Sequence, residues 1–424
     1  MSAAERTFGL LGRTLGHSYS PQIHRQLGSW PYVLFEREPE DVERLIRTEP
    51  WDGLNVTIPY KRDAARLADE RSPRVAALGV ANTLARRGDG TIFAENTDVL
   101  GFAWMLESFC QRNLARSAGD ALGGNEVLVL GSGGASKAVC LALTDVGARP
   151  SVISRTGDDT YETIPERHAS AALVINTTPV GMYPACPASP VTDETLASLE
   201  NLLGVLDVIY NPCRTGLCLA AERLGLPYAS GLDMLVAQAF YASELFQGTR
   251  LDESVIPQIV TSVSRHALNI VLIGMPGAGK TTSGRRLARI LGRPFVDLDD
   301  AIEMQEGISP AQMIVQRGED AFRASETAAC ATYGSRSGLV IACGGGVVTR
   351  PKNYALLHQN GTIVLLDRPI SELSSQGRPL SQTRGVEAIA QERMPLYRTW
   401  ADLSIATSGS ASGDAERIRA ALDL

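Results

Sequence analysis

The chain has 424 residues, a length that predicts two or three domains. It is 44% hydrophobic and 21% charged, which is typical of a globular protein, and a net charge of −7 argues against a nucleic-acid partner, which would need a basic face. The N-terminal segment lacks the apolar core of a signal peptide, and no apolar run is long enough to cross a membrane, so we expect a cytoplasmic protein. The seven cysteines show no metal-ligand spacing and are expected to be buried thiols.

The first hundred residues predict an α/β domain with polar side chains gathered at strand ends. A short strand (8–12) leads into GHSYSP (16–21), whose serines either hold a small polar ligand or cap a helix. A second strand ends in two polar residues that lie two apart, hence on one face, before a lysine. The candidate ligand-binding residues of this part are Ser18, Ser20, Asn55, Thr57, Lys61, Asn82 and Asp98.

A dinucleotide-binding pattern follows. The apolar strand 125–130 precedes a glycine-rich turn and a helical stretch (135–146), and the N-terminus of such a helix can carry a pyrophosphate. The next strand (150–154) ends in Ser154, Arg155 and Thr156, and a basic residue there favours the 2′-phosphate of NADP. The acidic Gly157-Asp158-Asp159 weakens this preference, and the span up to the strand 172–175 looks short. The cofactor candidates in the turn are Gly131, Gly133, Gly134 and Ala135.

These motifs together resemble a whole shikimate dehydrogenase, over about residues 7–249. The resemblance implies that the serines and polar residues listed above hold a hydroxylated cyclohexene carboxylate, with Lys61 and Asp98 at the reacting carbonyl. An ammonium group there can stabilise the developing negative charge and donate a proton. It further implies substrate contacts from Tyr210 and Gln238, and cofactor contacts from Thr177, Gly231 and Met234.

A connector with one helical segment (254–263) precedes a phosphate-binding loop. An apolar run (270–273) leads into GMPGAGKT (274–281), which fits G-x-x-x-x-G-K-[ST] at every fixed position. Its glycines let backbone N–H groups surround phosphate oxygens, its lysine would reach the outer phosphates, and Thr281 would bind Mg²⁺. The nucleotide-binding candidates are Gly277, Ala278, Gly279, Lys280, Thr281 and Thr282.

Acidic and basic residues after this loop suit phosphoryl transfer. Asp297 and Asp299 lie two apart at a strand end, so they are expected to point the same way, one toward Mg²⁺ and one toward an attacking hydroxyl. Arg323 offers a fork for a carboxylate, and a triple-glycine loop allows close approach of a ligand. The other candidates are Gly344, Gly345, Gly346 and Arg393, with Arg378 in a lid-like loop.

This second half resembles shikimate kinase over roughly 268–424. The resemblance implies that Asp297 is associated with the metal and that Asp299 contacts the reacting hydroxyl. It also implies that Arg323, Arg393 and the Gly344–Gly346 loop bind shikimate and that Arg378 binds phosphates. The lid segment looks short and lacks a further arginine that many members carry.

The two resemblances imply an α/β substrate domain and a Rossmann-like NADP domain, followed by a P-loop domain with a parallel sheet like that of nucleoside monophosphate kinases. The expected boundaries are 1–100, completed by helices at 231–250, then 101–230, a linker at 251–266, and 267–424. The implied activities are NADPH-dependent reduction of 3-dehydroshikimate and phosphorylation of shikimate by ATP with Mg²⁺, in a monomer or homodimer. A quinate dehydrogenase activity and a non-catalytic metabolite sensor are the alternatives.

Overall fold

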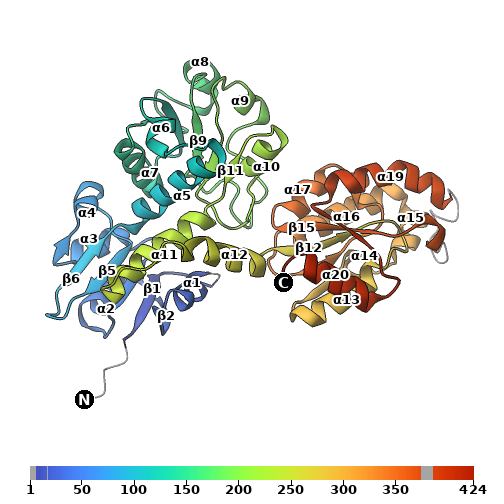
Figure 1. Cartoon of the computed structure of the whole chain (residues 1–424), viewed down its shortest axis with the longest axis horizontal. Helices are drawn as coiled ribbons and strands as arrows, with labels where there is room; N and C mark the ends of the chain where they lie inside the picture. Colours follow the sequence, from blue (N-terminus) through green and yellow to red (C-terminus); the bar gives the residue numbers. More distant parts are fainter. Residues whose placement is uncertain (1–5, 17, 374–384) are drawn as a thin grey trace. The chain divides into compact units, whose positions relative to one another are not determined.

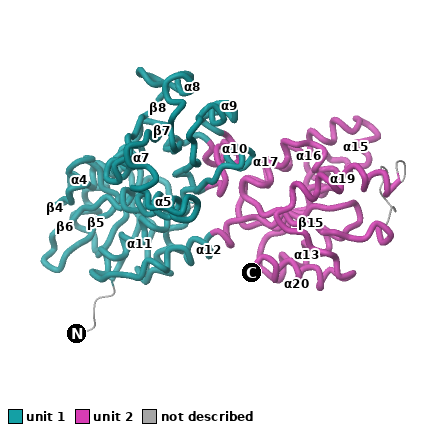
Figure 2. The backbone as a smooth tube through the Cα atoms, turned by 45° about the horizontal axis from the view of Figure 1, so that its top comes forward, with its two compact units in different colours: residues 1–180, 189–210, 220–263 teal, residues 181–188, 211–219, 264–424 magenta. Residues whose placement is uncertain are grey.

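The protein is described by a computed structural model over residues 6–16, 18–373 and 385–424. Its internal contacts define two compact units (Figure 2): unit 1 comprises residues 1–180, 189–210 and 220–263, and unit 2 comprises residues 181–188, 211–219 and 264–424. Unit 1 contains two β-sheets and unit 2 contains one, each accompanied by helices (Figure 1). The expected α/β fold class is therefore confirmed.

The first sheet of unit 1 has the strand order β2-β1-β3-β5-β6-β4. It is parallel from β2 to β3, whereas β5 runs antiparallel to both β3 and β6. Its strands are β1 (Phe8–Gly12), β2 (Tyr32–Glu36), β3 (Gly53–Val56), β4 (Glu70–Arg71), β5 (Thr83–Arg86) and β6 (Ile92–Glu95). The accompanying helices are α1 (Ser20–Gln26), η1 (Pro39–Asp41), α2 (Val42–Thr48), α3 (Lys61–Leu67) and α4 (Pro73–Leu78).

The register of this sheet brings the polar motifs together. Asn55 near the end of β3 pairs with Thr83 at the start of β5, and Thr83 pairs with Glu95 at the end of β6. Because β5 is antiparallel, its beginning and the ends of its two neighbours lie at the same edge. Residues widely separated in the chain therefore meet in one row.

The second sheet of unit 1 is parallel, with the order β11-β10-β9-β7-β8. Its strands are β7 (Glu126–Leu130), β8 (Arg149–Ile153), β9 (Leu173–Asn176), β10 (Val205–Asp207) and β11 (Tyr228–Ala229). Its helical segments are α5 (Thr97–Leu114), α6 (Ala118–Leu122), α7 (Gly134–Asp145), η2 (Tyr161–Thr163), α8 (Ile164–Arg167), α9 (Asp193–Ala197) and α10 (Gly216–Arg223). β8 is added on one side of β7, whereas β9, β10 and β11 are added on the other side. Open α/β sheets bind ligands at such a switch point, at the carboxyl ends of the strands.

Helix α11 (Leu232–Gln247) packs along α5 and against the first sheet. Glycines permit the close approach: a Cβ at Gly101 would lie 2.7 Å from the Met234 carbonyl oxygen and 2.8 Å from the Gln238 Cβ. A Cβ at Gly53 would lie 2.2 Å from the Phe246 ring. This packing sets Gln238 beside the row of polar residues. Helix α12 (Val255–Ala267) follows, where a helical connector was expected.

Unit 2 contains a parallel sheet of order β13-β14-β12-β15-β16. Alternate residues of β12 enter two different hydrophobic clusters, so the strand is buried on both faces, which explains its unbroken apolar run. The strands are β12 (Asn269–Ile273), β13 (Phe295–Asp297), β14 (Val340–Ala342), β15 (Gly361–Asp367) and β16 (Leu403–Ala406). The helical segments are α13 (Lys280–Leu291), α14 (Leu298–Glu306), α15 (Pro310–Arg317), α16 (Glu319–Gly334), η3 (Val347–Thr349), α17 (Lys352–His358), η4 (Ile370–Glu372), α19 (Val386–Trp400) and α20 (Ala411–Ala421).

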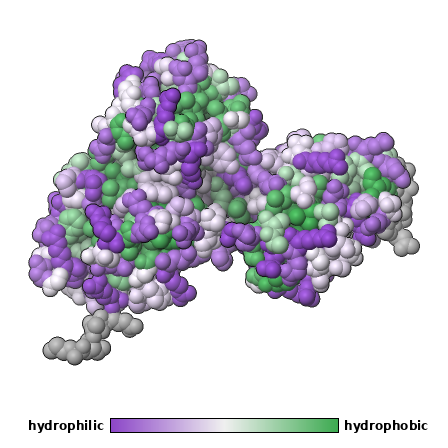
Figure 3. All heavy atoms as spheres, viewed as in Figure 1, coloured by the Kyte–Doolittle hydropathy of each residue, from purple (hydrophilic) through white to green (hydrophobic). Residues whose placement is uncertain are grey.

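The structure also shows the state of the cysteines and the distribution of hydrophobic residues on the surface. All seven cysteines are free thiols, but the expectation that all are buried is wrong for Cys140, Cys186 and Cys213, which are partly exposed. On the face drawn in Figure 3, hydrophilic residues are spread widely between smaller hydrophobic patches. Within the described ranges, no helix is long and apolar enough to cross a membrane.

Candidate active sites

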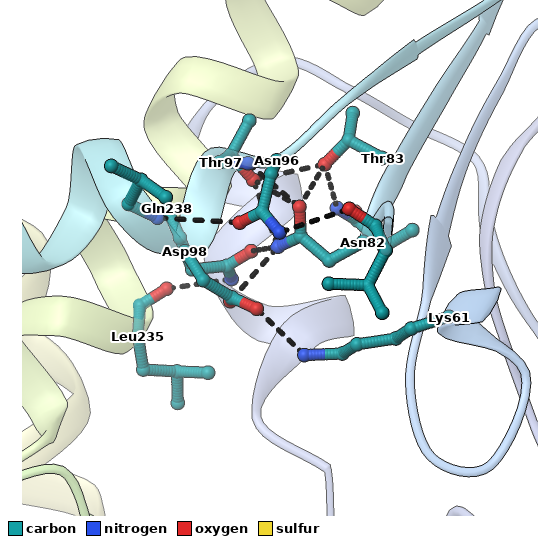
Figure 4. Close-up of polar contacts among 11 residues, drawn as sticks. Lys61, Asn82, Thr83, Asn96, Thr97, Asp98, Leu235 and Gln238 are labelled. Carbon is teal, nitrogen blue, oxygen red and sulfur yellow. Dashed lines mark hydrogen bonds and ion pairs between the residues drawn. The ribbon is translucent and has the colours of Figure 1, made fainter. Parts of the chain in front are cut away.

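A lysine–aspartate pair stands at the centre of the polar row in unit 1. The Lys61 Nζ lies 2.6 Å from Asp98 Oδ2, and Asn82 Nδ2 donates to Asp98 Oδ1 at 2.9 Å (Figure 4). Asp98 lies in the first turn of α5, which Asn96 caps, and this end of a helix favours a negative charge. Both carboxylate oxygens thus accept hydrogen bonds, one from Lys61 and one from Asn82.

The orientation of Asn82 is set by the backbone. The Thr97 backbone N–H donates to Asn82 Oδ1 at 2.7 Å, and because an N–H can only donate, the amide nitrogen faces Asp98. Gln238 is oriented in the same way, since its Nε2 donates to the Leu235 carbonyl and its Oε1 accepts from Asn82 at 3.4 Å. Four predicted residues, Lys61, Asn82, Asp98 and Gln238, therefore form one network (Figure 4).

The remaining substrate candidates of unit 1 lie around this network. Asn55 Nδ2 donates to Thr83 Oγ1 at 3.3 Å, and the Thr83 hydroxyl contacts Asn82, which joins β3 to the network. The two serines have a local link, because Ser18 Oγ accepts from the Ser20 backbone N–H at 3.2 Å. Tyr210 packs its ring 5.7 Å from that of Tyr19, which lies between the serines. Thr57 follows β3, and in the described part of the chain no side-chain hydrogen bond connects it to the others.

The glycine turn after β7 has the geometry of a phosphate-binding site. Gly131 has φ +105°, and a Cβ there would lie 2.8 Å from Thr178 Cγ2. Gly133 is the N-cap of α7 without a side-chain cap, and Cβ atoms at Gly133 or Gly134 would meet nothing within 4 Å. Thr177 Oγ1 donates to the Leu130 carbonyl at 2.7 Å, which fixes the end of β7 where the turn begins. The first-turn N–H groups of α7, which begins with Gly134 and Ala135, thus lie beneath open space.

The segment after β8 is more constrained than its composition indicates. Ser154 Oγ donates to the Thr156 carbonyl and folds the turn that carries Arg155. Asp159, one of the acids that seemed to oppose a 2′-phosphate, is paired with Arg167 Nη1 at 3.2 Å and lies 3.4 Å from His168 Nε2. Its negative charge is therefore already partly balanced.

Gly231 is the N-cap of α11, and Met234 lies in the first turn of this helix. A Cβ at Gly231 would lie 2.1 Å from the Val208 carbonyl oxygen, so glycine allows the helix to start directly against the end of β10. Met234 is buried, at 8% exposure.

The loop after β12 in unit 2 adopts a left-handed backbone conformation that favours glycine. Gly274, Gly277 and Gly279 have φ of +143°, +89° and +96°, and Gly279 is the N-cap of α13 without a side-chain cap. Lys280 is buried and its Nζ donates to the carbonyls of Gly274 and Met275 at 2.8 and 3.0 Å. The loop therefore folds back over the Lys280 side chain. The candidates Ala278 and Thr282 lie in the loop and in the first turn of α13, respectively.

The two acids after β13 are neighbours for a different reason than strand alternation. Asp297 ends β13 and is the N-cap of α14, where its Oδ1 accepts from the Asp299 backbone N–H at 3.0 Å, so Asp299 is helical and the alternation argument is wrong. Asp297 Oδ2 accepts from Thr281 Oγ1 at 2.6 Å, which brings both predicted metal ligands together. Burial, and then the charge of Asp297, raise the pKa of Asp299 to about 6.

These residues line a cavity of about 780 Å³ that also contains the basic candidates. Arg323 donates through Nη1 to Glu326 at 2.8 Å and through Nη2 to Glu319 at 3.0 Å, and Arg393 donates to the Gly345 carbonyl at 3.1 Å. The lining includes Lys280, Thr281, Asp297, Asp299, Arg323, Gly344, Gly345, Gly346, Arg368 and Arg393. Arg378 lies outside the described residues.

Two charged residues of this cavity, Glu326 and Arg368, were not predicted from the sequence. Glu326 is fully buried, and burial raises its pKa to about 7 although Arg323 opposes the shift. The sequence did contain one indication of this residue's role: Glu326 lies three residues after Arg323, a spacing at which two side chains on a helix can form an ion pair. Arg368 follows β15 directly and lines the cavity from there.

The folds and sites define an oxidoreductase-type dinucleotide unit with a lysine–aspartate pair, followed by a P-loop phosphotransferase unit. Comparison with known proteins agrees. The profile of the shikimate dehydrogenase substrate binding domain matches residues 10–84, and that of shikimate kinase matches residues 276–423.

Similar whole proteins cover the first part of the chain. Shikimate dehydrogenase (NADP(+)) of Clostridium beijerinckii is 34% identical over 266 residues, 58% of this chain and 93% of that protein. A chorismate mutase/shikimate 5-dehydrogenase fusion protein from Clostridium acetobutylicum is 31% identical with a TM-score of 0.56, over 62% of this chain and 98% of that one. Shikimate dehydrogenase 1 from Peptoclostridium difficile is 33% identical with a TM-score of 0.52, over 61% and 98%.

The chain therefore belongs to the shikimate dehydrogenase family and carries a shikimate kinase domain after it. It is a bifunctional enzyme of the shikimate pathway.

Proposed function

We propose that the chain reduces 3-dehydroshikimate to shikimate with NADPH and then transfers a phosphoryl group from ATP to the 3-hydroxyl of shikimate. The observation that carries this proposal is that both sites have their reactive groups in place: the Lys61–Asp98 pair in one unit, and Lys280 with Asp299 in the cavity of the other. The oxygen that the first step converts from carbonyl to alcohol is the nucleophile of the second. The expected domains, 1–100 with 231–250, 101–230 and 267–424, serve these two steps.

In the first step Lys61 is the proton donor. Asp98 accepts from both Asn82 and Lys61, and its bond to Lys61 keeps the ammonium group at the reacting oxygen. When the carbonyl is reduced, its oxygen becomes negative, and the ammonium stabilises this charge and gives up a proton. NADPH, when bound, supplies the hydride; the open turn at Gly131–Gly134 fits its pyrophosphate, and Arg155 would meet the 2′-phosphate.

In the second step the cavity of unit 2 holds shikimate and ATP. Arg323 uses three of its five N–H groups on Glu319 and Glu326, which leaves one on each terminal nitrogen for a bidentate bond to the shikimate carboxylate. Asp299, buried beside Lys280, would accept the proton of the attacking hydroxyl. Arg393 would add a second cation, and Gly344–Gly346 let the ring approach the backbone.

Thr281 and Asp297 fit a Mg²⁺ site that the nucleotide completes. The two side chains are in contact, and no group of three or more His, Cys, Asp or Glu among the described residues could hold a metal. Mg²⁺ commonly takes one or two protein ligands and fills the rest of its shell with water and phosphate oxygens. The ion, when bound, neutralises charge on the phosphates, and Lys280 would assist it.

A coupled assay on the full chain tests the proposal. The unaltered protein receives 3-dehydroshikimate, NADPH and Mg·ATP, with each cofactor omitted in turn, while NADPH absorbance and phosphorylated product are followed. We expect absorbance loss without ATP, and phosphorylated product only with both cofactors. K61M should abolish both readouts with 3-dehydroshikimate but leave phosphorylation of added shikimate intact, whereas K280M should abolish phosphorylation alone. Binding of shikimate with neither turnover would contradict the proposal and favour a sensor, and a faster reaction with quinate than with shikimate would reassign the first activity.

A further inference from the structure

Tyr32, a residue outside the predicted site, lies directly behind Asn55. It belongs to β2, two strands away from β3, and its hydroxyl donates to Asn55 Oδ1 at 2.8 Å. Both residues are buried, with exposures of 6% and 5%. Burial raises the pKa of Tyr32 well above its usual value, so the hydroxyl keeps its proton and remains a donor.

The contacts of Asn55 distinguish its amide oxygen from its amide nitrogen. The oxygen faces Tyr32 and the nitrogen donates to Thr83 Oγ1 at 3.3 Å. If the amide were turned round, the Tyr32 O–H would face an amide N–H₂ group instead of an acceptor and would have to turn to the Ser20 hydroxyl, its other hydrogen-bond partner. Tyr32 therefore selects one of the two orientations.

The consequence is a defined hydrogen-bonding character toward a ligand. The Asn55 amide has two hydrogens, and Thr83 takes one of them. The other hydrogen remains, so Asn55 presents an N–H donor that suits a hydroxyl or carboxylate oxygen of the ligand. A reversed amide would present a carbonyl oxygen and demand a donor.

The ring of Tyr32 is itself held in place. His24 stacks on it with ring centroids 4.2 Å apart, and His24 Nδ1 lies 3.1 Å from the Ser243 hydroxyl of α11. Ser29 donates to the same Ser243 at 2.8 Å. Burial lowers the pKa of His24 to about 3, so a neutral ring packs against the tyrosine. This buried layer joins α1, β2 and α11 behind the polar row.

We propose that Tyr32 is a positioning residue of the dehydrogenase site, which orients the Asn55 amide so that its N–H faces an oxygen of the shikimate ring. The inference rests on the proposed function of unit 1. It predicts that Tyr32 acts on shikimate binding mainly through Asn55, with the Ser20 hydroxyl as its second contact, and leaves the cofactor and Lys61 untouched.

The test is a double-mutant cycle on the full chain with Y32F, N55A and the double variant. The readouts are the dissociation constant of shikimate, measured by calorimetry, and KM and kcat for shikimate oxidation with NADP⁺. Y32F should raise the dissociation constant and KM for shikimate about 3- to 10-fold, with kcat and the NADP⁺ KM nearly unchanged, because one neutral hydrogen bond is lost. In the N55A background Y32F should cost much less than it does in the unaltered chain.

Two controls separate this role from a loss of structure. Tyr60 is also buried near this sheet, but its hydroxyl donates to the Arg37 backbone carbonyl. Y60F therefore removes a comparable hydroxyl that does not contact Asn55. An unchanged NADP⁺ KM reports intact folding of unit 1, and the kinase activity of the same chain normalises the preparations. An unchanged shikimate affinity in Y32F, or an equal loss in the N55A background, would overturn the inference. If the unaltered chain neither binds nor oxidises shikimate, the proposed function fails first and the inference falls with it.

Discussion

Replacement of Gly346 by alanine should displace Arg323 and weaken shikimate binding to the kinase site. A Cβ at Gly346 would lie 2.1 Å from both Nη1 and Nη2 of Arg323 and 2.3 Å from its Cζ. The backbone of Gly346, with φ −100° and ψ −1°, suits alanine, so the effect comes from the methyl group and not from strain. The guanidinium would have to move by about 1.3 Å to reach ordinary contact, which breaks its bond to Glu326.

The expected size follows from the bonds that a displaced Arg323 cannot make. A charge-assisted bond to a carboxylate contributes about 1.5–3 kcal/mol, so KM for shikimate should rise about 10- to 150-fold in G346A. KM for ATP and the dehydrogenase rate of the same chain should change little, because Arg323 lies neither in the phosphate-binding loop nor in unit 1.

Steady-state kinase kinetics with shikimate and ATP varied separately provide the measurement. The matched background is R323A, in which the methyl group has room and G346A should cost nothing further. An unchanged shikimate KM in G346A would refute the steric reasoning, and so would the same increase in the R323A background.

Three further predictions concern the other groups. R155A should raise KM for NADPH about 10-fold and leave KM for NADH unchanged, because only NADPH has the phosphate that Arg155 would bind; equal losses for both cofactors would count against this role. Removal of Mg²⁺ with EDTA should stop phosphorylation while NADPH consumption continues, and added Mg²⁺ should restore it; phosphorylation that persists in EDTA would exclude the Thr281–Asp297 site. His24 is neutral in the fold but gains a proton in the unfolded chain below pH 6.5, so its contribution to stability is lost as pH falls from 6.5 toward 3. H24F should therefore remove about 2 kcal/mol of the loss in unfolding free energy between pH 7 and pH 5, measured by urea unfolding, and identical pH profiles would contradict the burial argument.

Much of both sites could be predicted from the sequence because it depends on local chemistry. The glycines at 274, 277 and 279 have the positive φ values that such a loop requires, and the lysine and threonine follow at the start of the helix. The same holds for the turn at Gly131–Gly134. Lys61 and Asp98 were predicted from their motifs, and the structure places them 2.6 Å apart.

The tertiary structure alone decided how these motifs meet. The antiparallel β5 aligns Asn55, Thr83 and Glu95, and the glycine contact at Gly101 sets α11 close enough for Gln238 to reach Asn82. Neither strand register nor helix packing is a local property, since both depend on which apolar surfaces bury one another. Glu326 and Tyr32 escaped notice for the same reason: each acts through a buried contact, with Arg323 and with Asn55, that no spacing rule marks as functional. Local patterns thus determined which chemistry the chain carries, and long-range burial determined the orientation of the groups that perform it.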